Sequence, residues 1–370
     1  MRRINIDDLK PDMILARSIY SSDGRILLNA GMVLNEQYIA RLSDLGILSV
    51  YIVDEVFGID HEVEDVVSER TRIETIQLVK DSFASLEQAR KINVKMVQTL
   101  VGRLIDELLE HPQVLINLSD IRSYDDYTFA HSVNVCILSL MTGITLGYND
   151  TKLKELGIGA LLHDIGKVSL DKALINKPED LSREEYELIK HHPQLGFEIL
   201  RKYDDISLLS AHVAFQHHER WDGNGYPRGL AGEAIHEYAR IVAVAVVYDA
   251  LLADRPYRSS YSVNQAITIL RRMAGVHLEK RCVDAFVVNI AIYPIGSIVE
   301  LNSGVIGVVV DVNREMPNRP VVKVVYDKLT RRFYQAHEVD LSKLETVLIT
   351  RILEEREIAQ LLNRNTPDSS

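Results

Sequence analysis

The stretch Leu161-Leu162-His163-Asp164-Ile165-Gly166-Lys167 decides how this chain is interpreted. It places an imidazole and a carboxylate next to each other at the end of an apolar helical segment, which Gly166 is expected to break. A second adjacent pair, His217-His218, follows later in the chain. Neighbouring residues of a helix point about 100° apart, so each pair can serve two metal ions lying side by side. Single histidines at positions 131 and 192 complete a donor set large enough for two ions. The middle of the chain is therefore predicted to be a metal site.

The bulk composition narrows the class of protein. The 370 residues are enough for about two or three domains, and a hydrophobic content of 46% is enough for a buried core. The formal net charge of −11 argues against DNA binding, because non-specific phosphate contacts require an excess of Lys and Arg. A small phosphorylated substrate remains compatible, since metal ions would supply positive potential. Cys136 and Cys282 lie in apolar surroundings without CxxC spacing, which favours a reducing compartment.

Two features predict a cytoplasmic protein that does not enter the membrane. The N-terminus, Met1-Arg2-Arg3-Ile4-Asn5-Ile6-Asp7-Asp8, carries charges where a signal peptide would need apolar residues. The uncharged run 131–149 includes Asn134, Ser139 and Thr142, so a buried helix is expected there rather than a membrane span.

Four segments are expected along the chain. Residues 1–60 combine short apolar runs, turn signals, a helical pattern and the strand-like run 49–53, which is typical of a small α/β module. Residues 66–120 have almost no Gly or Pro and are expected to form a connector of long amphipathic helices. Residues 121–293 alternate helices with short loops; Ser182-Arg183-Glu184-Glu185 is a capping-box sequence, and the apolar run 208–216 is expected to be a helix. Residues 294–363 change to a strand period, with strands expected at 297–301, 304–312 and 321–325, and end in a helix at 351–363. The predicted fold is mainly α, with an all-helical central domain and a β-rich C-terminal appendage.

The helical connector leaves two interpretations open. Ile73, Ile76, Val79 and Phe83 share one face of a helix, and leucines at positions 100, 104 and 108 continue the pattern. Such a face can pack on the helices of its own domain or form the seam of a homodimer, and the helical period fits both equally.

Histidines outside the predicted site are expected to be structural, because a lone histidine in a helix is usually a surface or hydrogen-bonded core residue. His191 and His212 lie within the cluster but are redundant beside the better-placed histidines. Lys167, four residues after His163, is expected to reach a phosphoryl oxygen of a substrate. The predicted metal ligands are His131, His163, Asp164, His192, His217 and His218.

The loop Trp221-Asp222-Gly223-Asn224-Gly225-Tyr226-Pro227 also has two interpretations. Asp-Gly and Asn-Gly dipeptides form tight surface turns by themselves. Because the loop follows the His217-His218 pair so closely, it is instead expected to face the substrate. Gly225 permits a close backbone approach, and Tyr226 can stack on a base or donate a hydrogen bond to a phosphate.

From residue 121 to about residue 290 the chain resembles the HD-GYP family, a branch of the HD-domain metal-dependent phosphohydrolases. The matching segments are His163-Asp164-Ile165-Gly166-Lys167, His192-Pro193, the run from His217 to Pro227, Tyr248-Asp249-Ala250-Leu251 and Asp254-Arg255-Pro256-Tyr257-Arg258. The resemblance implies an all-helical domain that hydrolyses the bacterial second messenger cyclic di-GMP to pGpG or GMP at two or three metal ions, usually iron or manganese. It also implies substrate contacts by Asp249, Arg255 and Arg258. Residues 1–55 are similar to a small domain often found ahead of HD-GYP domains, and the β-rich appendage also recurs in such proteins.

Two departures from the family pattern concern the metal centre. Family members typically read Val-Ala-Asp-Val-Phe-Asp-Ala where this chain reads Val-Ala-Val-Val-Tyr-Asp-Ala over residues 244–250, so Val246 replaces a metal ligand of the family. Members with three metals have a Glu one turn before the first histidine, where this chain has Tyr127, which favours two ions. The missing carboxylate leaves one ion under-coordinated, and Asp249 is expected to fill the gap directly or through water.

The first functional hypothesis is a cyclic di-GMP phosphodiesterase in which a hydroxide bridging two ions attacks phosphorus in line. Asp164 would hold both ions, and Lys167 would offset charge in the transition state. The alternative is a cyclic di-GMP-binding receptor or scaffold protein with little hydrolysis, because Val246 replaces the expected ligand. A third hypothesis, a nucleoside-monophosphate phosphohydrolase, does not require the Gly-Tyr-Pro loop. The expected partners are cyclic di-GMP, a second copy of the chain through the connector, and signalling proteins.

Overall fold

The computed structural model describes residues 1–20, 26–45, 47, 49–54, 57, 66–110, 127–175, 177, 179, 181–253, 261–313 and 316–363. The chain divides into two compact units. The helical unit contains residues 66–114 and 127–289, and the second unit joins residues 1–65 and 115–126 to residues 290–370. The helical unit is therefore inserted, in sequence, between the two ends of the other unit.

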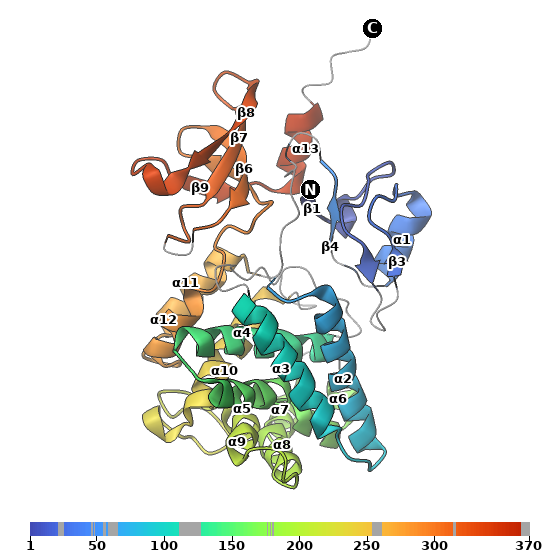
Figure 1. The fold of residues 1–370 in the computed structure, drawn as a ribbon, viewed down its shortest axis with the longest axis vertical. Coiled ribbons are helices and arrows are strands. Elements are labelled where there is room, and N and C mark those ends of the chain that lie inside the picture. The colour runs from blue at the N-terminus through green and yellow to red at the C-terminus, as the bar shows by residue number, and fades with distance from the viewer. Residues whose placement is uncertain are drawn as a thin grey trace. The chain divides into compact units, whose positions relative to one another are not determined.

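Several helices of the helical unit begin at side chains that accept hydrogen bonds from free backbone N–H groups. Ser68, Asn149 and Ser207 cap three of them in this way, and Ser182 forms the predicted capping box with Glu185. The helices are α2 (Glu69–Glu87), α3 (Val94–Glu110), α4 (Tyr127–Thr145), α5 (Asp150–Leu161), α6 (Lys172–Ile175), α7 (Arg183–Ile189), α8 (His192–Leu200), α9 (Leu208–Gln216), α10 (Glu237–Leu252), α11 (Val263–Met273) and α12 (Lys280–Val287) (Figure 1).

Helix α4 is the centre of the helical unit. Its apolar residues face all directions, and α2, α5, α10 and α12 pack around it. Val133, Ile137 and Leu140 are fully buried. The expected buried helix is present, but it spans Tyr127–Thr145 and ends before residue 149. Within the described parts of the chain, no helix is both long and apolar enough to cross a membrane.

The connector helices α2 and α3 pack on this same core. Ile76 and Phe83 of α2, and Leu100, Leu104 and Leu108 of α3, are buried, and α2 and α3 contact α4 and α5 respectively. Their apolar faces are thus used within the chain, as in the first of the two interpretations. Residues 111–120 of the predicted connector lie outside the described residues.

The N-terminal part of the other unit is a small α/β module, as expected. Strand β1 (Arg2–Asn5) pairs antiparallel with β4 (Ser49–Ile52), and β2 (Ile19–Tyr20) pairs with β3 (Ile26–Leu28). Helix α1 (Glu36–Asp44) is capped by Asn35, whose side chain accepts a hydrogen bond from the Tyr38 backbone N–H. The apolar residues of these elements form one core.

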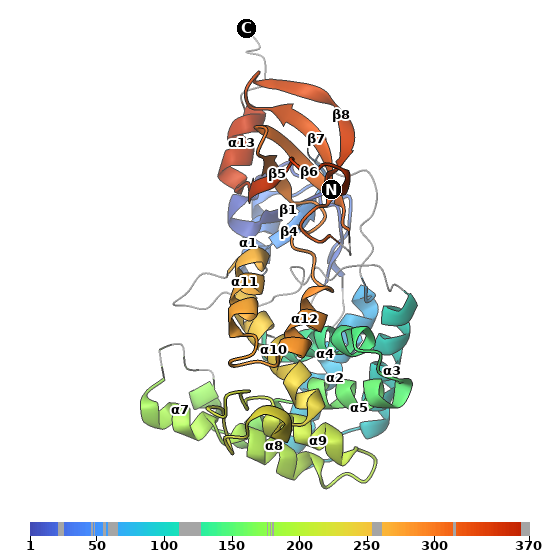
Figure 2. The ribbon, with the colours of Figure 1, turned by 90° about the vertical axis from the view of Figure 1, so that its left-hand side faces the viewer.

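The C-terminal part is a five-stranded antiparallel sheet with the strand order β8-β7-β6-β5-β9. Its strands are β5 (Ile298–Leu301), β6 (Val305–Asp311), β7 (Val321–Asp327), β8 (Arg332–Asp340) and β9 (Ile349–Ile352). Helix α13 (Glu355–Asn363) follows and lies beside the sheet (Figure 2). The helix predicted from residue 351 begins only at Glu355, because residues 349–352 pair instead with the free edge of β5.

The two ends of the chain share a core within this unit. Phe57 is fully buried among residues of the C-terminal sheet and α13. Arg2 is buried as well, and its guanidinium group donates hydrogen bonds to Asp54, at 2.6 Å, and to Glu355 of α13. The N-terminal module and the C-terminal sheet are therefore packed together, although more than half of the chain separates them in sequence.

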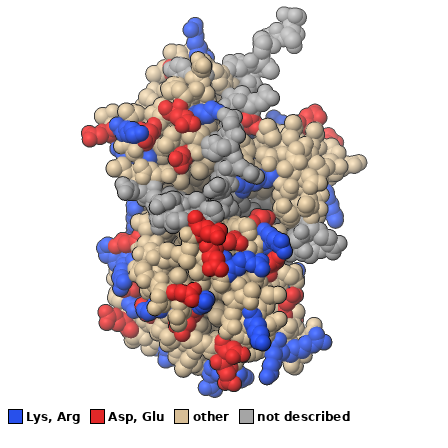
Figure 3. Space-filling model, in the orientation of Figure 1, with Lys and Arg blue, Asp and Glu red and all other residues tan. Residues whose placement is uncertain are grey.

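The surface carries acidic and basic side chains side by side. Figure 3 shows both signs interspersed over the face in view. Many of the described surface charges are paired one helical turn apart, as in Arg70–Glu74 and Lys154–Asp150. Such pairs are typical of a solvated surface and contribute little to stability.

Candidate metal centre

The predicted ligands lie at or near the ends of four helices. Helix α5 ends at Leu161, and the chain turns through His163 and Asp164 into a short 3-10 helix, Ile165–Ser169. His192 opens α8 with Pro193 in its first turn, where a proline is tolerated because the first N–H groups have no partner in the helix. His217 caps the C-terminus of α9, and His131 lies in the first turns of α4. Each side chain can therefore point beyond its own helix into a shared space.

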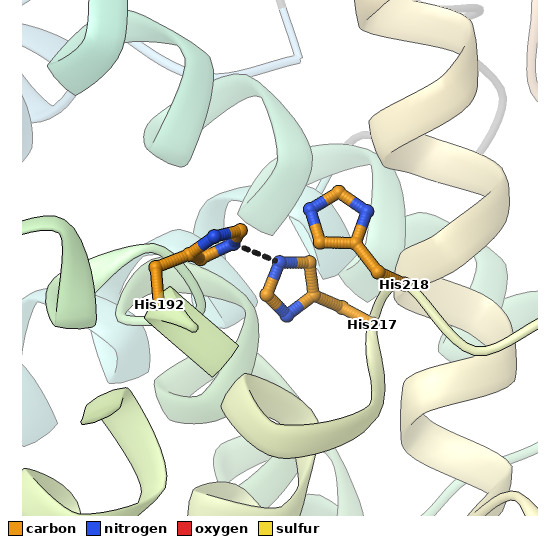
Figure 4. Close-up of side chains that lie close together, drawn as sticks. All are labelled: His192, His217 and His218. Carbon is orange, nitrogen blue, oxygen red and sulfur yellow. Dashed lines mark hydrogen bonds between the residues drawn. The ribbon is translucent and has the colours of Figure 1, made fainter. Parts of the chain in front are cut away.

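The structure brings all six predicted ligands into two groups of three. His131, His163 and Asp164 form the first group, and His192, His217 and His218 form the second. Within each group the nearest donor atoms all lie within 4.8 Å of one another. The second group is drawn in Figure 4. Two clusters of three N and O donors fit the two-ion site predicted from the sequence.

Asp164 lies between the two groups. Its Oδ2 atom is 3.4 Å from Nε2 of His163, whereas its Oδ1 atom is 3.3 Å from Nε2 of His192 and 3.8 Å from Nε2 of His217. One carboxylate oxygen thus faces each group. This is the arrangement expected of a carboxylate that bridges two ions.

Three of the histidines are oriented by nearby backbone carbonyl groups. The Nδ1 atoms of His163, His192 and His217 lie 2.8, 2.7 and 2.9 Å from the carbonyl oxygens three residues earlier in the chain. A carbonyl oxygen only accepts hydrogen bonds, so each Nδ1 must carry the proton. The Nε2 atom of each neutral ring then carries no proton, and its lone pair is available to bind a metal.

These lone pairs face each other at short range. The Nε2 atoms of His192 and His217 are 3.2 Å apart (Figure 4). Burial lowers the pKa of His192 to about 4 and that of His217 well below its usual value, so both rings are neutral at pH 7. The buried Nε2 atom of His163 has no hydrogen-bond partner among the described residues. Two converging lone pairs and an unsatisfied third one are costly to bury unless a cation lies between them.

His131 is oriented by a residue from another helix. Its Nδ1 atom lies 2.7 Å from Oδ2 of Asp249, and the other oxygen of that carboxylate accepts a hydrogen bond from Nδ2 of Asn134 at 3.0 Å. Asp249 is fully buried on α10. Its oxygens contact two residues of α4, and its expected contact with substrate or with the under-coordinated ion stays a prediction. The geometry places Asp249 to orient His131 and to support it as a predicted ligand.

We expect Asp249→Asn to weaken metal binding about 10- to 100-fold, because the amide keeps the volume but removes the charge that strengthens His131 as a donor. Titration of the purified protein against a chromophoric chelator measures the affinity. Asp284→Asn, on the exposed surface of α12, is the matched control. An unchanged affinity in Asp249→Asn would show that the contact with His131 does not support a ligand.

Lys167 is part of the same centre. Its Nζ atom is 2.6 Å from Oδ2 of Asp164. Burial by itself would raise the pKa of Asp164, but the positive charge of Lys167 holds it well below its usual value. Asp164 is therefore ionised at physiological pH and available as a metal ligand, and the ammonium group lies where negative charge is concentrated.

The loop after the histidine pair is fixed against the site. The buried carboxylate of Glu219 accepts hydrogen bonds from the backbone N–H groups of Arg228 and Leu230, both at 2.9 Å. A Cβ atom at Gly225 would lie 2.4 Å from the Arg220 nitrogen, so only glycine fits there. The ring of Tyr226 stacks on His218 with 4.6 Å between centroids. Pro227 is half-buried beside it.

The remaining predicted residues are placed as follows. Val246 is half-buried on α10, three residues before Asp249. His191 is exposed, and His212 lies between Phe197 and Gln216, so neither belongs to the two groups. Arg255, Arg258 and the side chain of Tyr127 lie outside the described residues. The contacts of Asn134 and Glu219 were not predicted, although Asn134 stands one helical turn after His131 and Glu219 directly follows the histidine pair.

Comparisons with known proteins agree with this geometry. Residues 104–281 match the family model described as "HD domain", and residues 298–361 match the one described as "KOW domain associated with HD domain". This chain is an HD-domain protein. The family resemblance recognised from the motifs is thereby confirmed, and so is the mainly helical fold. HD domains bind divalent metals, which fits the two groups of donors.

Individual relatives carry named activities. Over 267 residues, this chain is 37% identical to "Cyclic di-GMP phosphodiesterase PA4108" of Pseudomonas aeruginosa. The matched region covers 72% of this chain and 64% of that protein. The chain is 36% identical over 186 residues to "3'3'-cGAMP-specific phosphodiesterase 1" of Vibrio cholerae, covering 50% of this chain and 42% of that one. The chain thus spans less than two thirds of either relative. The solved structure of Bd1817, an HDG"Y"P protein from Bdellovibrio bacteriovorus, is similar in fold, with a TM-score of 0.51 at 20% identity over 77% of this chain and 97% of that one.

Proposed function

We propose that this protein hydrolyses cyclic di-GMP in a reaction that depends on two divalent metal ions. The observation that carries the proposal is the pair of three-residue donor groups joined by Asp164. The names of the relatives support the substrate and the reaction. Iron and manganese are the ions that we expect, because the resemblance to HD-GYP proteins implies them.

The six ligands would hold the ions, with Asp164 shared between them. When bound, the ions polarise phosphoryl oxygens and lower the pKa of a water molecule. The ammonium group of Lys167, at 2.6 Å from Asp164, is placed to offset the negative charge that builds up on the phosphoryl group. Burial and the contact with Tyr186 raise the pKa of Tyr226, so its hydroxyl stays protonated and can donate a hydrogen bond to substrate.

The test is product formation by protein purified without oxygen and supplied with Fe(II) or Mn(II). Chromatography would separate cyclic di-GMP from the linear product pGpG and from GMP. We expect linear product only when metal is present, and 3'3'-cGAMP run in parallel would report the choice of base. Absence of product, with metal bound and cyclic di-GMP still binding, would overturn the phosphodiesterase and favour a receptor.

Val246 is the observation behind that second candidate, a cyclic di-GMP receptor with weak hydrolysis. We expect Val246→Asp to tighten the binding of one ion by about an order of magnitude, the size of effect that one supporting group typically has at a metal site, and to raise turnover. Metal content by mass spectrometry and initial rates measure the two effects. Val247→Asp adds the same charge to the next position of α10 and is the control. Equal metal content and turnover in Val246→Asp and the unmodified protein would show that the missing carboxylate has no consequence.

Dimerisation through the connector stays a prediction. The apolar faces of α2 and α3 are already buried against α4 and α5, so a dimer seam would have to use their outer faces. The exposed apolar residues Met96 and Leu109 of α3, 46% and 50% exposed, lie thirteen positions apart and point in different directions.

A further inference from the structure

Helix α7 is attached to the helical unit by few contacts. None of its seven residues is buried, and Tyr186 and Leu188 are 45% and 56% exposed. The capping box and the ion pair between Glu185 and Lys177, at 2.7 Å, stabilise the helix locally. Because α7 contributes nothing to the core, packing does not explain which side chains it presents.

Tyr186 of α7 and Lys190, the residue that directly follows this helix, form a cluster with Tyr226. The Nζ atom of Lys190 lies 5.0 Å from the ring centroid of Tyr186 and 5.7 Å from that of Tyr226. Tyr186 is among the groups that raise the pKa of the Tyr226 hydroxyl, so the two side chains are close neighbours. The ring of Tyr226 in turn stacks on His218 at 23° between planes. The cluster Tyr186–Lys190–Tyr226 is thus joined directly to one of the six metal ligands.

This packing limits what Tyr226 can do. His218 covers one face of its ring, and the ammonium group of Lys190 lies close to the same ring, so a base could stack there only by displacing a neighbour. What the cluster offers to a ligand is a cation held between two aromatic rings. Lys190 is also paired with Glu187 at 2.7 Å, but that pair lies one turn apart on the surface and is weak enough to exchange for a phosphate.

The two lysines near the centre differ in position. Lys167 contacts Asp164, between the two donor groups, whereas Lys190 lies beyond His218 on the side of Tyr226. A cyclic dinucleotide carries two phosphodiester groups. If one of them reaches the metal ligands, the other must be bound further out.

We propose that Lys190 binds the phosphate of a cyclic dinucleotide that is not being cleaved, with Tyr186 and Tyr226 as positioning residues that hold its ammonium group. This inference rests on the proposed function. A compact ammonium group binds phosphate through charge-assisted hydrogen bonds, and the two rings restrict where it can lie. Lys190 would then contribute to substrate binding and not to the chemical step.

The experiment compares two substrates with the metal-loaded, full-length protein. Lys190→Ala is expected to raise the KM for cyclic di-GMP about tenfold, as expected for the loss of one charged hydrogen bond, with kcat within about twofold. Hydrolysis of bis(p-nitrophenyl) phosphate, which has a single phosphate, should not change. Lys190→Arg should restore most of the affinity, and Tyr186→Ala should raise KM less than Lys190→Ala does. Lys154→Ala removes an equally paired surface lysine and is the control, as is Leu188→Ala on α7 itself.

The outcomes separate this inference from the proposed function. Normal cyclic di-GMP turnover with an unchanged KM in Lys190→Ala would overturn the role of Lys190 alone. Equal losses on both substrates would also overturn it, because they would point to a disturbed metal centre. If the unmodified protein does not hydrolyse cyclic di-GMP, binding is measured instead as the inhibition of bis(p-nitrophenyl) phosphate hydrolysis by cyclic di-GMP. Lys190→Ala should then weaken that inhibition about tenfold. No inhibition at all would overturn both proposals.

Discussion

Asp164→Asn is expected to abolish turnover while the fold is retained. The asparagine side chain has the same shape, but it cannot supply one anionic oxygen to each donor group, as Asp164 does toward His163 and His192. The substitution also removes the negative charge that pairs with Lys167 and that would partly neutralise the two metal ions. We expect turnover to fall by at least about a thousandfold, which corresponds to roughly 4 kcal/mol of transition-state stabilisation.

Three measurements check this expectation. Steady-state hydrolysis gives the loss of activity, mass spectrometry gives the metal content, and circular dichroism during heating shows whether the helices remain folded. Asp164→Ala should behave in the same way as Asp164→Asn. Asp204→Asn changes the net charge equally at an exposed site and should leave all three unchanged. Turnover above a tenth of the original in Asp164→Asn would mean that this carboxylate is not at the reaction centre.

Gly166→Ala is expected to disrupt the metal centre by a purely steric route. A Cβ atom at position 166 would lie 2.0 Å from the carbonyl oxygen of His192 and 2.4 Å from the backbone nitrogen of Gly196. Both atoms belong to the backbone of α8, so no side chain can move aside. The 3-10 helix would have to separate from α8, and His163 and Asp164 would move away from His192. We expect a loss of about 3 kcal/mol in the free energy of unfolding, together with loss of bound metal.

Denaturant unfolding and metal analysis test this prediction. Gly102→Ala, in α3, is the matched control, because a Cβ atom there meets nothing within 4 Å. Alanine is the better helix former, so this variant should be stabilised by about 0.5–1 kcal/mol. A Gly166→Ala protein with unchanged unfolding and full metal content would show that the contact between the two backbones is not needed.

Local elements of the fold could be predicted from the sequence. Helix α9 spans Leu208–Gln216, as the apolar pattern indicated, and Ser182 and Glu185 form the predicted capping box. Strands β8 and β9 were not predicted. β9 is defined by its pairing with β5, as in Leu301 with Ile349, and such pairing depends on residues distant in sequence. The local pattern therefore predicted a helix at residues 351 and 352, which belong to β9.

The ligand types of the candidate site could be predicted in the same way. Adjacent His-Asp and His-His pairs at helix ends are visible in the sequence, and the structure collects these residues into two groups. The orienting partner of His131 could not be predicted, because Asp249 belongs to α10 and reaches His131 only through the packing of α10 on α4. Lys190 was missed for a similar reason, since its contact with Tyr226 joins a surface helix to a distant loop.

Gly166 illustrates which features could be predicted from the sequence and which required the tertiary structure. The sequence determined the donor set, the helix ends that present it and the mainly helical class, because these depend on residue chemistry and on spacing within a few turns. It indicated Gly166 only as a helix breaker, although α5 already ends at Leu161. Only the tertiary structure decided that Gly166 faces Gly196 across two backbones and so brings Asp164 to His192. The physical reason is that close packing between segments depends on the shapes of both surfaces, and a one-dimensional pattern contains neither.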